Sequence, residues 1–257
     1  MTYRWGRPGN APVLLLHSLA AHSHWWDWVA ALLVDRHDVV AVDFRGHGAS
    51  AWADQYSFDD YVADVGAVLD VLAWPTPLVI GHSMGGYVAA LLAARHPERV
   101  GALVIVDMLT GWSADMDRRA RMQADRAPVE VPSVAAIAER FRLAPPDTRA
   151  PADRLRHLGE AGVAARTPGR WTVSFDRRVF LHSPPDPWSF IGDIATPALV
   201  VRGEGSVVMT RDAAERLAQA MRFGESAEIP GAYHHAIVDD PEAFVRILLG
   251  WRARSTA

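Results

Sequence analysis

Ser83 stands in a segment whose residues suit nucleophilic catalysis. Residues 81–86 read G-H-S-M-G-G and follow a short apolar run, Leu78–His82, that is typical of a buried strand. A helical pattern begins at Met84, so the serine occupies a strand–turn–helix context. Glycines in such a turn let strand and helix approach closely, while the helix N-terminus points its amides at developing negative charge. The arrangement predicts a nucleophilic serine.

Two other residue types that support covalent catalysis are missing from the chain. All 26 basic residues are arginine, and cysteine is absent. The protein therefore has no lysine for a Schiff base or a phosphate-binding loop, and no thiol for catalysis, thiolate zinc sites or disulfides. The net charge of −4 offers no broad basic surface, so nucleic acid is not expected as a partner. Ser83 is left as the one well-placed nucleophile.

At the serine turn the chain resembles the α/β-hydrolase family, and the resemblance extends over nearly its whole length. Residues 43–50, D-F-R-G-H-G-A-S, look like the family's D-x-R-G-x-G-x-S loop after the fourth strand. That loop is structural in the family, so Asp43, Arg45 and His47 are left outside the predicted catalytic set. The resemblance implies an α/β fold with a mostly parallel central sheet flanked by helices, and a helical cap (lid) insertion.

The resemblance also implies a catalytic histidine late in the chain. Residues 230–235, P-G-A-Y-H-H, precede Asp240–Phe244 and are similar to the family's G-x-G-H before a helix start, with Tyr233 replacing the second glycine. This alignment selects His234 as general base, with His235 as second choice. An imidazole with a near-neutral pKa can take the serine proton and deliver it to the leaving group. A surface or capping role is expected for the other histidines considered, which are His22, His24, His37, His96, His157 and His182.

The acid that should orient this imidazole is an open question. Most family members carry an Asp three residues beyond a glycine after the seventh strand, but here Gly203 is followed by Ser206 at that place. A serine cannot supply the negative charge. Asp107 ends another strand candidate, and some family members take their acid from that strand end. We predict Asp107 as the acid and keep Glu204, which has a longer arm near the usual place, as the alternative.

The oxyanion hole is expected to use backbone amides on both sides of the site. After the first apolar run comes His17-Ser18-Leu19, which looks like the family's H-G-x loop with serine in place of glycine. A serine here costs backbone freedom but leaves the amide donors present. We assign the oxyanion hole to the amides of Leu19 and Met84, the residue after the nucleophile.

The elements that must position these groups follow an alternating pattern. Short apolar runs alternate with helical patterns, as expected for βα units around a mostly parallel sheet. Helices are predicted over Phe58–Leu72 with Ser57 as N-cap, over Met84–His96, and over Glu242–Trp251. The strand candidates are Val13–His17, Val39–Asp43, Leu78–His82, Ala102–Asp107, Ala198–Gly203 and Ala227–Ile229.

The alternation of strand and helix patterns stops between about residues 111 and 190. Strand signals almost vanish there, prolines recur, and arginines outnumber acidic residues. We interpret the stretch as a helical cap, which divides the chain into an N-terminal core part (1–110), the cap (111–190) and a C-terminal core part (191–257). Three aromatic residues of the cap, Trp112, Phe141 and Trp188, are predicted to line an apolar substrate pocket.

The N-terminal region was searched for signals of cellular location. The run Val13–Leu16 is too short for a signal core or a membrane span. We therefore expect a cytoplasmic protein with a small-molecule substrate and no membrane partner. Acyl transfer through serine and histidine needs no metal or cofactor, so none is expected. The oligomeric state stays open.

The leading hypothesis is a serine hydrolase that cleaves a carboxylic ester, lactone or thioester through a Ser83 acyl-enzyme, with His234 as general base. Hydrolysis of a carbon–carbon bond in a diketone-like substrate is the runner-up, since the same two residues could serve. A non-hydrolytic lyase, cyclase or ligand-binding protein with an altered triad is the alternative from a different class, because Ser206 stands at the usual acid position. Dehalogenation and epoxide opening are disfavoured, since related enzymes of those types have Asp where Ser83 stands.

Overall fold

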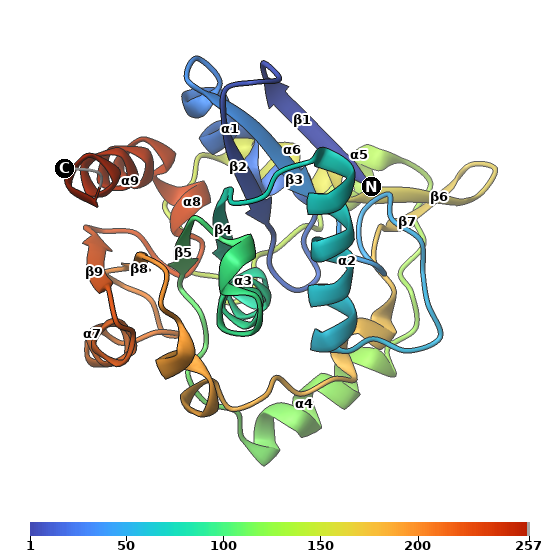
Figure 1. Ribbon diagram of the computed structural model, residues 1–257. Coiled ribbons are helices and arrows are strands. Elements are labelled where there is room, and N and C mark those ends of the chain that lie inside the picture. The colour runs from blue at the N-terminus through green and yellow to red at the C-terminus, as the bar shows by residue number, and fades with distance from the viewer. Residues whose placement is uncertain (256–257) are drawn as a thin grey trace.

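A computed structural model describes residues 1–255 of the chain. Its central strands are β1 (Thr2–Gly6), β2 (Ala11–Leu16), β3 (His37–Val42), β4 (Leu78–His82), β5 (Ala102–Val106), β8 (Ala198–Gly203) and β9 (Gly224–Ile229). Within the described range these seven strands form one sheet in the order β1-β3-β2-β4-β5-β8-β9 (Figure 1). β1 runs antiparallel to β3, and every other neighbouring pair is parallel. The mostly parallel sheet confirms the predicted fold class.

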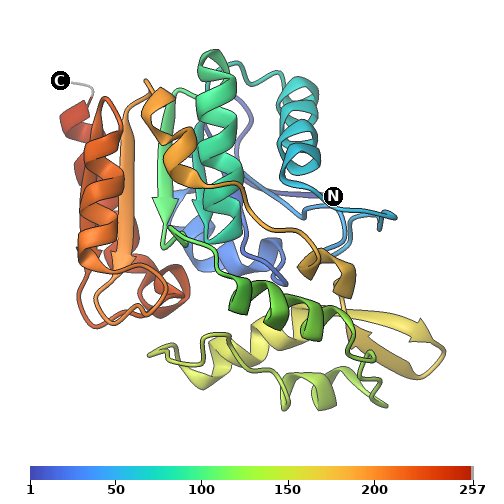
Figure 2. The ribbon, with the colours of Figure 1, turned by 90° about the horizontal axis from the view of Figure 1, so that it is seen from below.

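Helices cover both faces of this sheet. They are α1 (Asp27–Leu33), α2 (Phe58–Leu72), α3 (Met84–Arg95), α7 (Arg211–Ala220), α8 (Ala236–Asp239) and α9 (Pro241–Ser255), with short 3-10 turns η1 (Ser23–Trp26), η2 (Pro97–Arg99) and η5 (Ile191–Asp193). Strand side chains alternate between two apolar cores. Val79 and Leu103 pack with α2, α3 and α7 on one face, whereas Ile80 and Val104 pack with α1 and α9 on the other. Figure 2 shows α2 and α3 side by side on the first face.

Most predicted elements are confirmed. α2 covers the predicted residues and begins after Ser57, whose hydroxyl accepts the Asp60 amide. β4 and β8 also match the predicted bounds. β1 was not predicted, because its five residues only alternate between exposed and half-buried positions at the sheet edge. None of the helices in residues 1–255 combines the length and the apolar character needed to cross a membrane.

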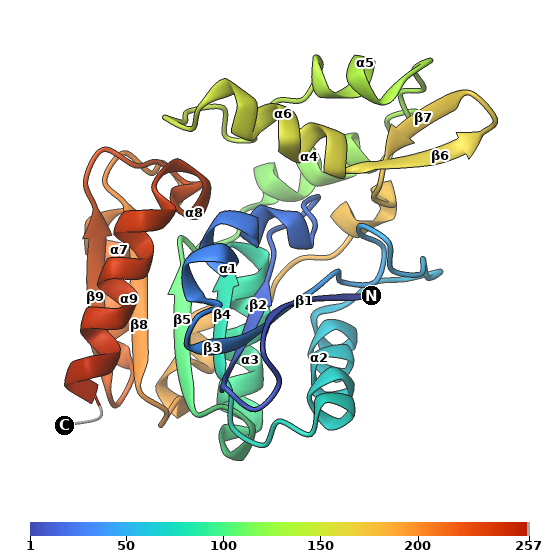
Figure 3. The same ribbon diagram turned by 90° about the horizontal axis from the view of Figure 1, so that it is seen from above.

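The chain between β5 and β8 forms a layer over one end of the sheet. It holds α4 (Ala114–Ala124), α5 (Val134–Ala138), α6 (Ala152–Ala161), the strands β6 (Val163–Thr167) and β7 (Arg170–Val173), and the short turns η3 (Arg177–Phe180) and η4 (Pro187–Ser189). Figure 3 shows α4, α5, α6 and the β6–β7 hairpin lying together on the side toward which β4 and β5 point. We propose residues 111–190 as the extent of this cap.

The hairpin corrects the expectation of a purely helical insertion. β6 and β7 pair antiparallel around a turn at Pro168 and Gly169. Gly169 has φ of 75°, a left-handed conformation that glycine adopts without strain. A Pro-Gly pair of this kind is a turn signal, and it indicates a chain reversal that the apolar pattern alone does not show.

Buried neutral histidines hold the loops that follow β2 and β3. His17 Nε2 accepts the Phe44 amide at 3.1 Å, and its Nδ1 lies 2.7 Å from the Ser18 carbonyl oxygen. His47 Nε2 accepts the Ala20 amide at 3.1 Å. A ring nitrogen that accepts a hydrogen bond carries no proton, so both rings are neutral in this arrangement. Burial lowers the pKa of His17 to about 4 and holds the pKa of His47 well below its ordinary value.

Two other histidines depart from the surface or capping role that the sequence predicted. Burial lowers the pKa of His22 and of His182 to about 4 in each case. His22 is only 4% exposed, and its Nε2 lies 3.1 Å from the carbonyl oxygen of Leu158. Sequence spacing did not distinguish these enclosed rings from the exposed ring of His96.

We predict that mild acid destabilises the protein. The unfolded chain takes up protons on these histidines below pH about 6.5, whereas the folded chain resists protonation until about pH 4. The stabilisation is therefore complete above pH 6.5 and is lost as the pH falls, by about 2 kcal/mol per fully buried histidine between pH 7 and 5. Denaturant unfolding at pH 7, 6 and 5 measures this loss.

The matched variants for that measurement are His182→Phe and His96→Gln. Replacing the enclosed His182 by an apolar ring should make the free energy of unfolding less dependent on pH. Replacing the exposed His96 should leave the dependence unchanged. A free energy of unfolding that stays constant from pH 7 to 5 in the unmodified protein contradicts the prediction.

Candidate active site

Ser83 occupies the turn between β4 and α3. Its φ of 52° and ψ of −114° are an unusual conformation for a residue with a side chain, as expected for a nucleophile in a sharp strand–helix turn. A Cβ on Gly81 would lie 2.1 Å from the Gly85 carbonyl oxygen, and a Cβ on Gly85 would lie 2.2 Å from that of Leu16. Both glycines are therefore needed for the close approach of strand and helix. This geometry agrees with the predicted elbow.

Asp107 lies directly after the neighbouring strand and is strained in the same sense. Its φ is 48°, and its amide donates to the Val201 carbonyl oxygen at 2.8 Å. The Ser83 amide in turn donates to the Val106 carbonyl oxygen at 2.8 Å. Non-glycine residues with positive φ persist only where surrounding contacts hold them, and they cluster at functional sites. The ends of β4 and β5 thus present a serine and a carboxylate side by side.

The structure brings His234 and Asp107 together. His234 Nδ1 lies 2.8 Å from Asp107 Oδ1, and the two side chains are 4% and 0% exposed. The carboxylate also accepts the Ser206 hydroxyl at 2.6 Å and the Gly203 amide at 3.0 Å. Hydrogen bonds from these donors compensate for removing the carboxylate from water.

Glu204, the alternative acid, points elsewhere. Its Oε2 accepts the Gly231 amide at 2.7 Å, at the start of the loop that carries His234. Ser206 occupies the position where most family members carry the acid, and its hydroxyl donates a hydrogen bond to Asp107 from there. Of the two carboxylates left open by the sequence, the structure therefore places Asp107 at the imidazole.

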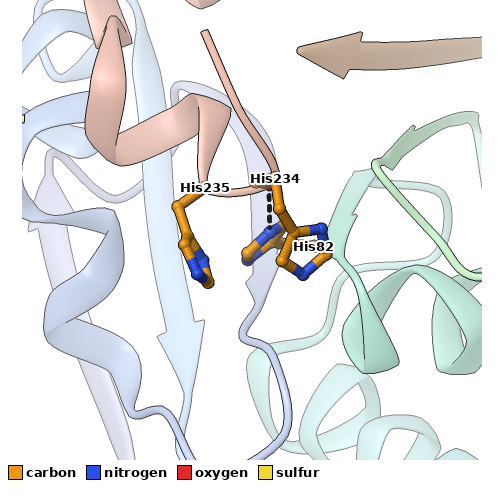
Figure 4. Close-up of side chains that lie close together, drawn as sticks. All are labelled: His82, His234 and His235. Atoms are coloured by element: carbon orange, nitrogen blue, oxygen red, sulfur yellow. Dashed lines mark hydrogen bonds between the residues drawn. The ribbon is translucent and has the colours of Figure 1, made fainter. Parts of the chain in front are cut away.

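His82 connects the nucleophile turn to the base loop. Its Nε2 lies 3.0 Å from the carbonyl oxygen of His234. Figure 4 marks this hydrogen bond with a dashed line. Burial, with smaller contributions from the neighbouring histidines, holds the pKa of His82 well below its ordinary value. His235 Nε2 lies 3.2 Å from the carbonyl oxygen of Pro145 in the cap. The second-choice base therefore faces the cap chain, and burial lowers the pKa of His235 to about 3.

A cavity of about 80 Å³ lies beside Ser83. Both residues predicted for the oxyanion hole, Leu19 and Met84, line it, and so does Trp112 from the cap. Sequence patterns predicted none of the remaining lining residues as pocket residues, because these come from separate elements that only the fold assembles. They are Phe58, Tyr87, Leu109, His182 and Pro184.

Two predicted pocket residues lie away from this cavity, which corrects the sequence analysis. Phe141 borders a separate hollow within the cap and packs against Trp25 with ring centroids 6.4 Å apart. Trp188 is 38% exposed, donates its indole N–H to the Thr110 carbonyl oxygen at 3.1 Å, and lies under the Arg216 guanidinium. Both aromatics stabilise local packing, and their position in the cap sequence did not reveal which way they face.

The loop that was set aside as structural behaves as expected. Asp43 accepts the Ser23 amide and hydroxyl at 2.7 and 2.6 Å, and the Ala49 amide at 2.9 Å. Arg45 forms a two-pronged ion pair with Asp64, with both distances 2.6 Å. These side chains tie loops together and leave the catalytic set unchanged.

Comparison with known proteins places the chain in a family. The family model of the alpha/beta hydrolase fold matches residues 11–145, which is more than half of the chain. An esterase of Mycobacterium tuberculosis is 29% identical over 96% of this chain and 84% of its own length. A 2-(acetamidomethylene)succinate hydrolase of Mesorhizobium japonicum is 26% identical over 93% and 87%. A serine hydrolase-like protein of Danio rerio is 42% identical, but that match spans 40% of this chain and 32% of the relative.

Solved structures share the fold over nearly the whole chain. The crystal structure of an E-2-(acetamidomethylene)succinate hydrolase superposes with a TM-score of 0.86 at 22% identity, covering 98% of this chain and 94% of that one. A thioesterase domain from the curacin biosynthetic pathway gives 0.82 at 22% identity, covering 96% and 94%. At this level of identity the likeness shows the fold alone. Together with the family-model match, it shows that the chain belongs to the α/β-hydrolase fold family.

Proposed function

We propose that the protein is a serine hydrolase that cleaves a carboxylic ester, lactone or thioester through an acyl-enzyme on Ser83. The observation that carries the proposal is the buried contact of His234 Nδ1 with Asp107 Oδ1 at 2.8 Å. The loop that carries His234 is also hydrogen-bonded to His82, the residue before the serine. A carboxylate on Nδ1 leaves Nε2 of the imidazole as the basic nitrogen. Relatives over nearly the full length that are named esterase and hydrolase support the same reaction class.

The proposed reaction has an acylation and a deacylation half. In the first half, His234 Nε2 takes the Ser83 hydroxyl proton as Oγ attacks the substrate carbonyl carbon, and the amides of Leu19 and Met84 stabilise the oxyanion. The imidazolium then gives its proton to the leaving group, and the acyl group stays on the serine. In the second half, the same imidazole activates water, which releases the acid and restores Ser83. Asp107 stabilises the imidazolium in both halves.

The acid in this proposal acts from the end of β5 because its surroundings hold it there. Ser206 and Gly203 direct hydrogen bonds at the two oxygens of Asp107, so Oδ1 stays aligned with the ring of His234. A charged group fixed in this way needs little reorganisation when the imidazolium forms. The position of the acid in sequence therefore differs from the usual place while its role stays the same.

Ser83→Ala tests the nucleophile. We expect a fluorophosphonate probe to label the unmodified protein at Ser83, and the variant to lose labelling and about a thousandfold or more of ester turnover, because the acyl-enzyme cannot form. Intact mass measurement and p-nitrophenyl ester assays report both effects. Absence of labelling in well-folded unmodified protein points to a ligand-binding protein, and labelling without ester or thioester turnover points to carbon–carbon or cyclase chemistry.

Asp107→Asn and Glu204→Gln test the acid. We expect Asp107→Asn to lower kcat/KM by a factor of about 10³–10⁴. The imidazolium of His234 would lose its negatively charged partner, and the neutral ring would no longer be held in the tautomer that leaves Nε2 basic. Glu204→Gln should change kcat/KM less than about tenfold, since its contact is to a loop amide. Thermal unfolding of both variants controls for folding. The reverse ranking of the two activities overturns the assignment.

The size of the cavity beside Ser83 predicts a preference for small acyl groups. About 80 Å³ corresponds to roughly three water-sized groups, so acetyl or propionyl p-nitrophenyl esters should exceed the octanoyl ester about tenfold or more in kcat/KM. Trp112→Ala enlarges the cavity and should narrow this difference. Phe141→Ala, a matched loss of an aromatic ring in a separate hollow, should leave the difference in place. Equal turnover of short and long esters argues against the cavity as the acyl site.

A further inference from the structure

A second group of possible ligand atoms lies outside the active site, where α1 meets α6. His24, Asp27 and His157 each offer one ligand atom, and these atoms all lie within 4.8 Å of one another. Asp27 Oδ2 lies 3.1 Å from His24 Nδ1 and 2.7 Å from His157 Nε2. His24 and Asp27 belong to the core elements η1 and α1, whereas His157 belongs to α6 of the cap. Figure 3 shows α6 lying over α1.

We propose that His24, Asp27 and His157 form a binding site for a divalent transition-metal ion such as Zn²⁺, which links the cap to the core. Two imidazole nitrogens and one carboxylate oxygen are a donor set that suits Zn²⁺. Three protein ligands leave a further position for water. The site is separate from Ser83 and does not depend on the proposed hydrolysis.

The spacing of the donor atoms fits such an ion. Zinc bonds of 2.0–2.2 Å in a tetrahedral site set neighbouring donors about 3.3 Å apart. The two distances to Asp27, 3.1 and 2.7 Å, are already close to this value. The rings of His24 and His157 are nearly perpendicular, at 85°, with centroids 6.2 Å apart. The two imidazoles therefore approach the site from different directions and do not stack on each other. The candidate ligand atoms of His24 and His157 lie within 4.8 Å of each other, so these partly exposed side chains need to move closer together to reach the tetrahedral spacing.

Solvent can reach this group. The side chains of His24, Asp27 and His157 are 30%, 22% and 45% exposed, so a hydrated ion can approach and the ligands can turn toward it. An ion bound between them would also be attracted by the negative charge of Asp27. Among the ion pairs of the described residues, this carboxylate pairs only with the imidazoles of His24 and His157. Accessibility and a carboxylate ligand together favour metal binding here.

The other cluster of histidines is a poorer candidate. The candidate ligand atoms of His82, His234 and His235 also lie within 4.8 Å of one another, but all three side chains are buried. Figure 4 shows these three side chains close together. One ring nitrogen of each is already engaged, by the His234 carbonyl oxygen, by Asp107 and by the Pro145 carbonyl oxygen. That cluster belongs to the active site and has no carboxylate among its three ligands. It therefore serves as the comparison site in the test.

A metal at the junction would strengthen a contact that the protein already makes. The Arg154 guanidinium of α6 lies 5.0 Å from the ring centroid of Trp28, and the Leu158 carbonyl oxygen meets His22 at 3.1 Å. These contacts dock α6 beside the start of α1. Coordination by His157 and Asp27 would add metal–ligand bonds between the cap and the core at this junction. The bound ion should therefore raise the thermal unfolding midpoint.

The test measures metal binding directly. The full chain without a polyhistidine tag, treated with chelator, is titrated with ZnCl₂ by calorimetry and with Co²⁺ by visible absorption, and its unfolding midpoint is recorded with and without Zn²⁺. We expect one ion per chain at this site and a higher midpoint with Zn²⁺. His157→Gln and Asp27→Asn should weaken binding about tenfold or more and remove the midpoint shift. His96→Gln, a change at an exposed histidine elsewhere, should leave both readouts unchanged.

Three outcomes overturn the proposal. The first is no binding by the unmodified protein at millimolar Zn²⁺. The second is unchanged affinity in both His157→Gln and Asp27→Asn, with midpoints in the absence of metal that show both to be folded. The third is binding that survives in His157→Gln but is lost in His235→Gln, which assigns the ion to the buried active-site histidines.

Discussion

The buried carboxylate of Asp107 is the group around which the site is arranged. A charge removed from water is costly unless several donors face it, and here donors from two loops do so. Ser206 and Gly203 approach from the end of β8, and His234 approaches from the loop after β9. The need to satisfy one carboxylate therefore brings together three segments that are distant in sequence. It also sets the orientation of the imidazole that serves the proposed reaction.

The parallel sheet supplies the frame for this arrangement. Parallel strands end at the same edge, so Ser83 after β4 and Asp107 after β5 become neighbours without a long connection. Both residues take positive φ values, and the amide of each is held by a carbonyl oxygen of the adjoining strand. His82 adds a hydrogen bond to the backbone of His234. The ends of β4 and β5 thus carry the proposed nucleophile and acid, while the proposed base lies on a loop that is hydrogen-bonded to both strand ends.

Two of the contacts between cap and core bear on the proposals. Over the strand ends the cap provides Trp112, His182 and Pro184 to the small cavity beside Ser83, so access to the serine depends on the cap. At its other end α6 meets η1 and α1, where His157 contacts Asp27. The second contact is one of several that dock α6 on the core, together with those of Arg154 and Leu158.

The sequence by itself determined most elements of the core and identified two of the proposed catalytic residues, Ser83 and His234. The buried strands are continuous apolar runs, α2 begins at a capping serine, and the glycines around Ser83 mark the elbow, because each of these signals is local. Only the tertiary structure decided between Asp107 and Glu204, because the choice depends on where each side chain finds its hydrogen-bond partners. The same holds for Phe141 and Trp188, whose direction no local pattern reveals, and for the contact of Asp27 with His157 across 130 positions of sequence. Contacts of this kind arise when separate elements pack against one another. The sequence alone can therefore identify candidate residues but does not show which of them are in contact.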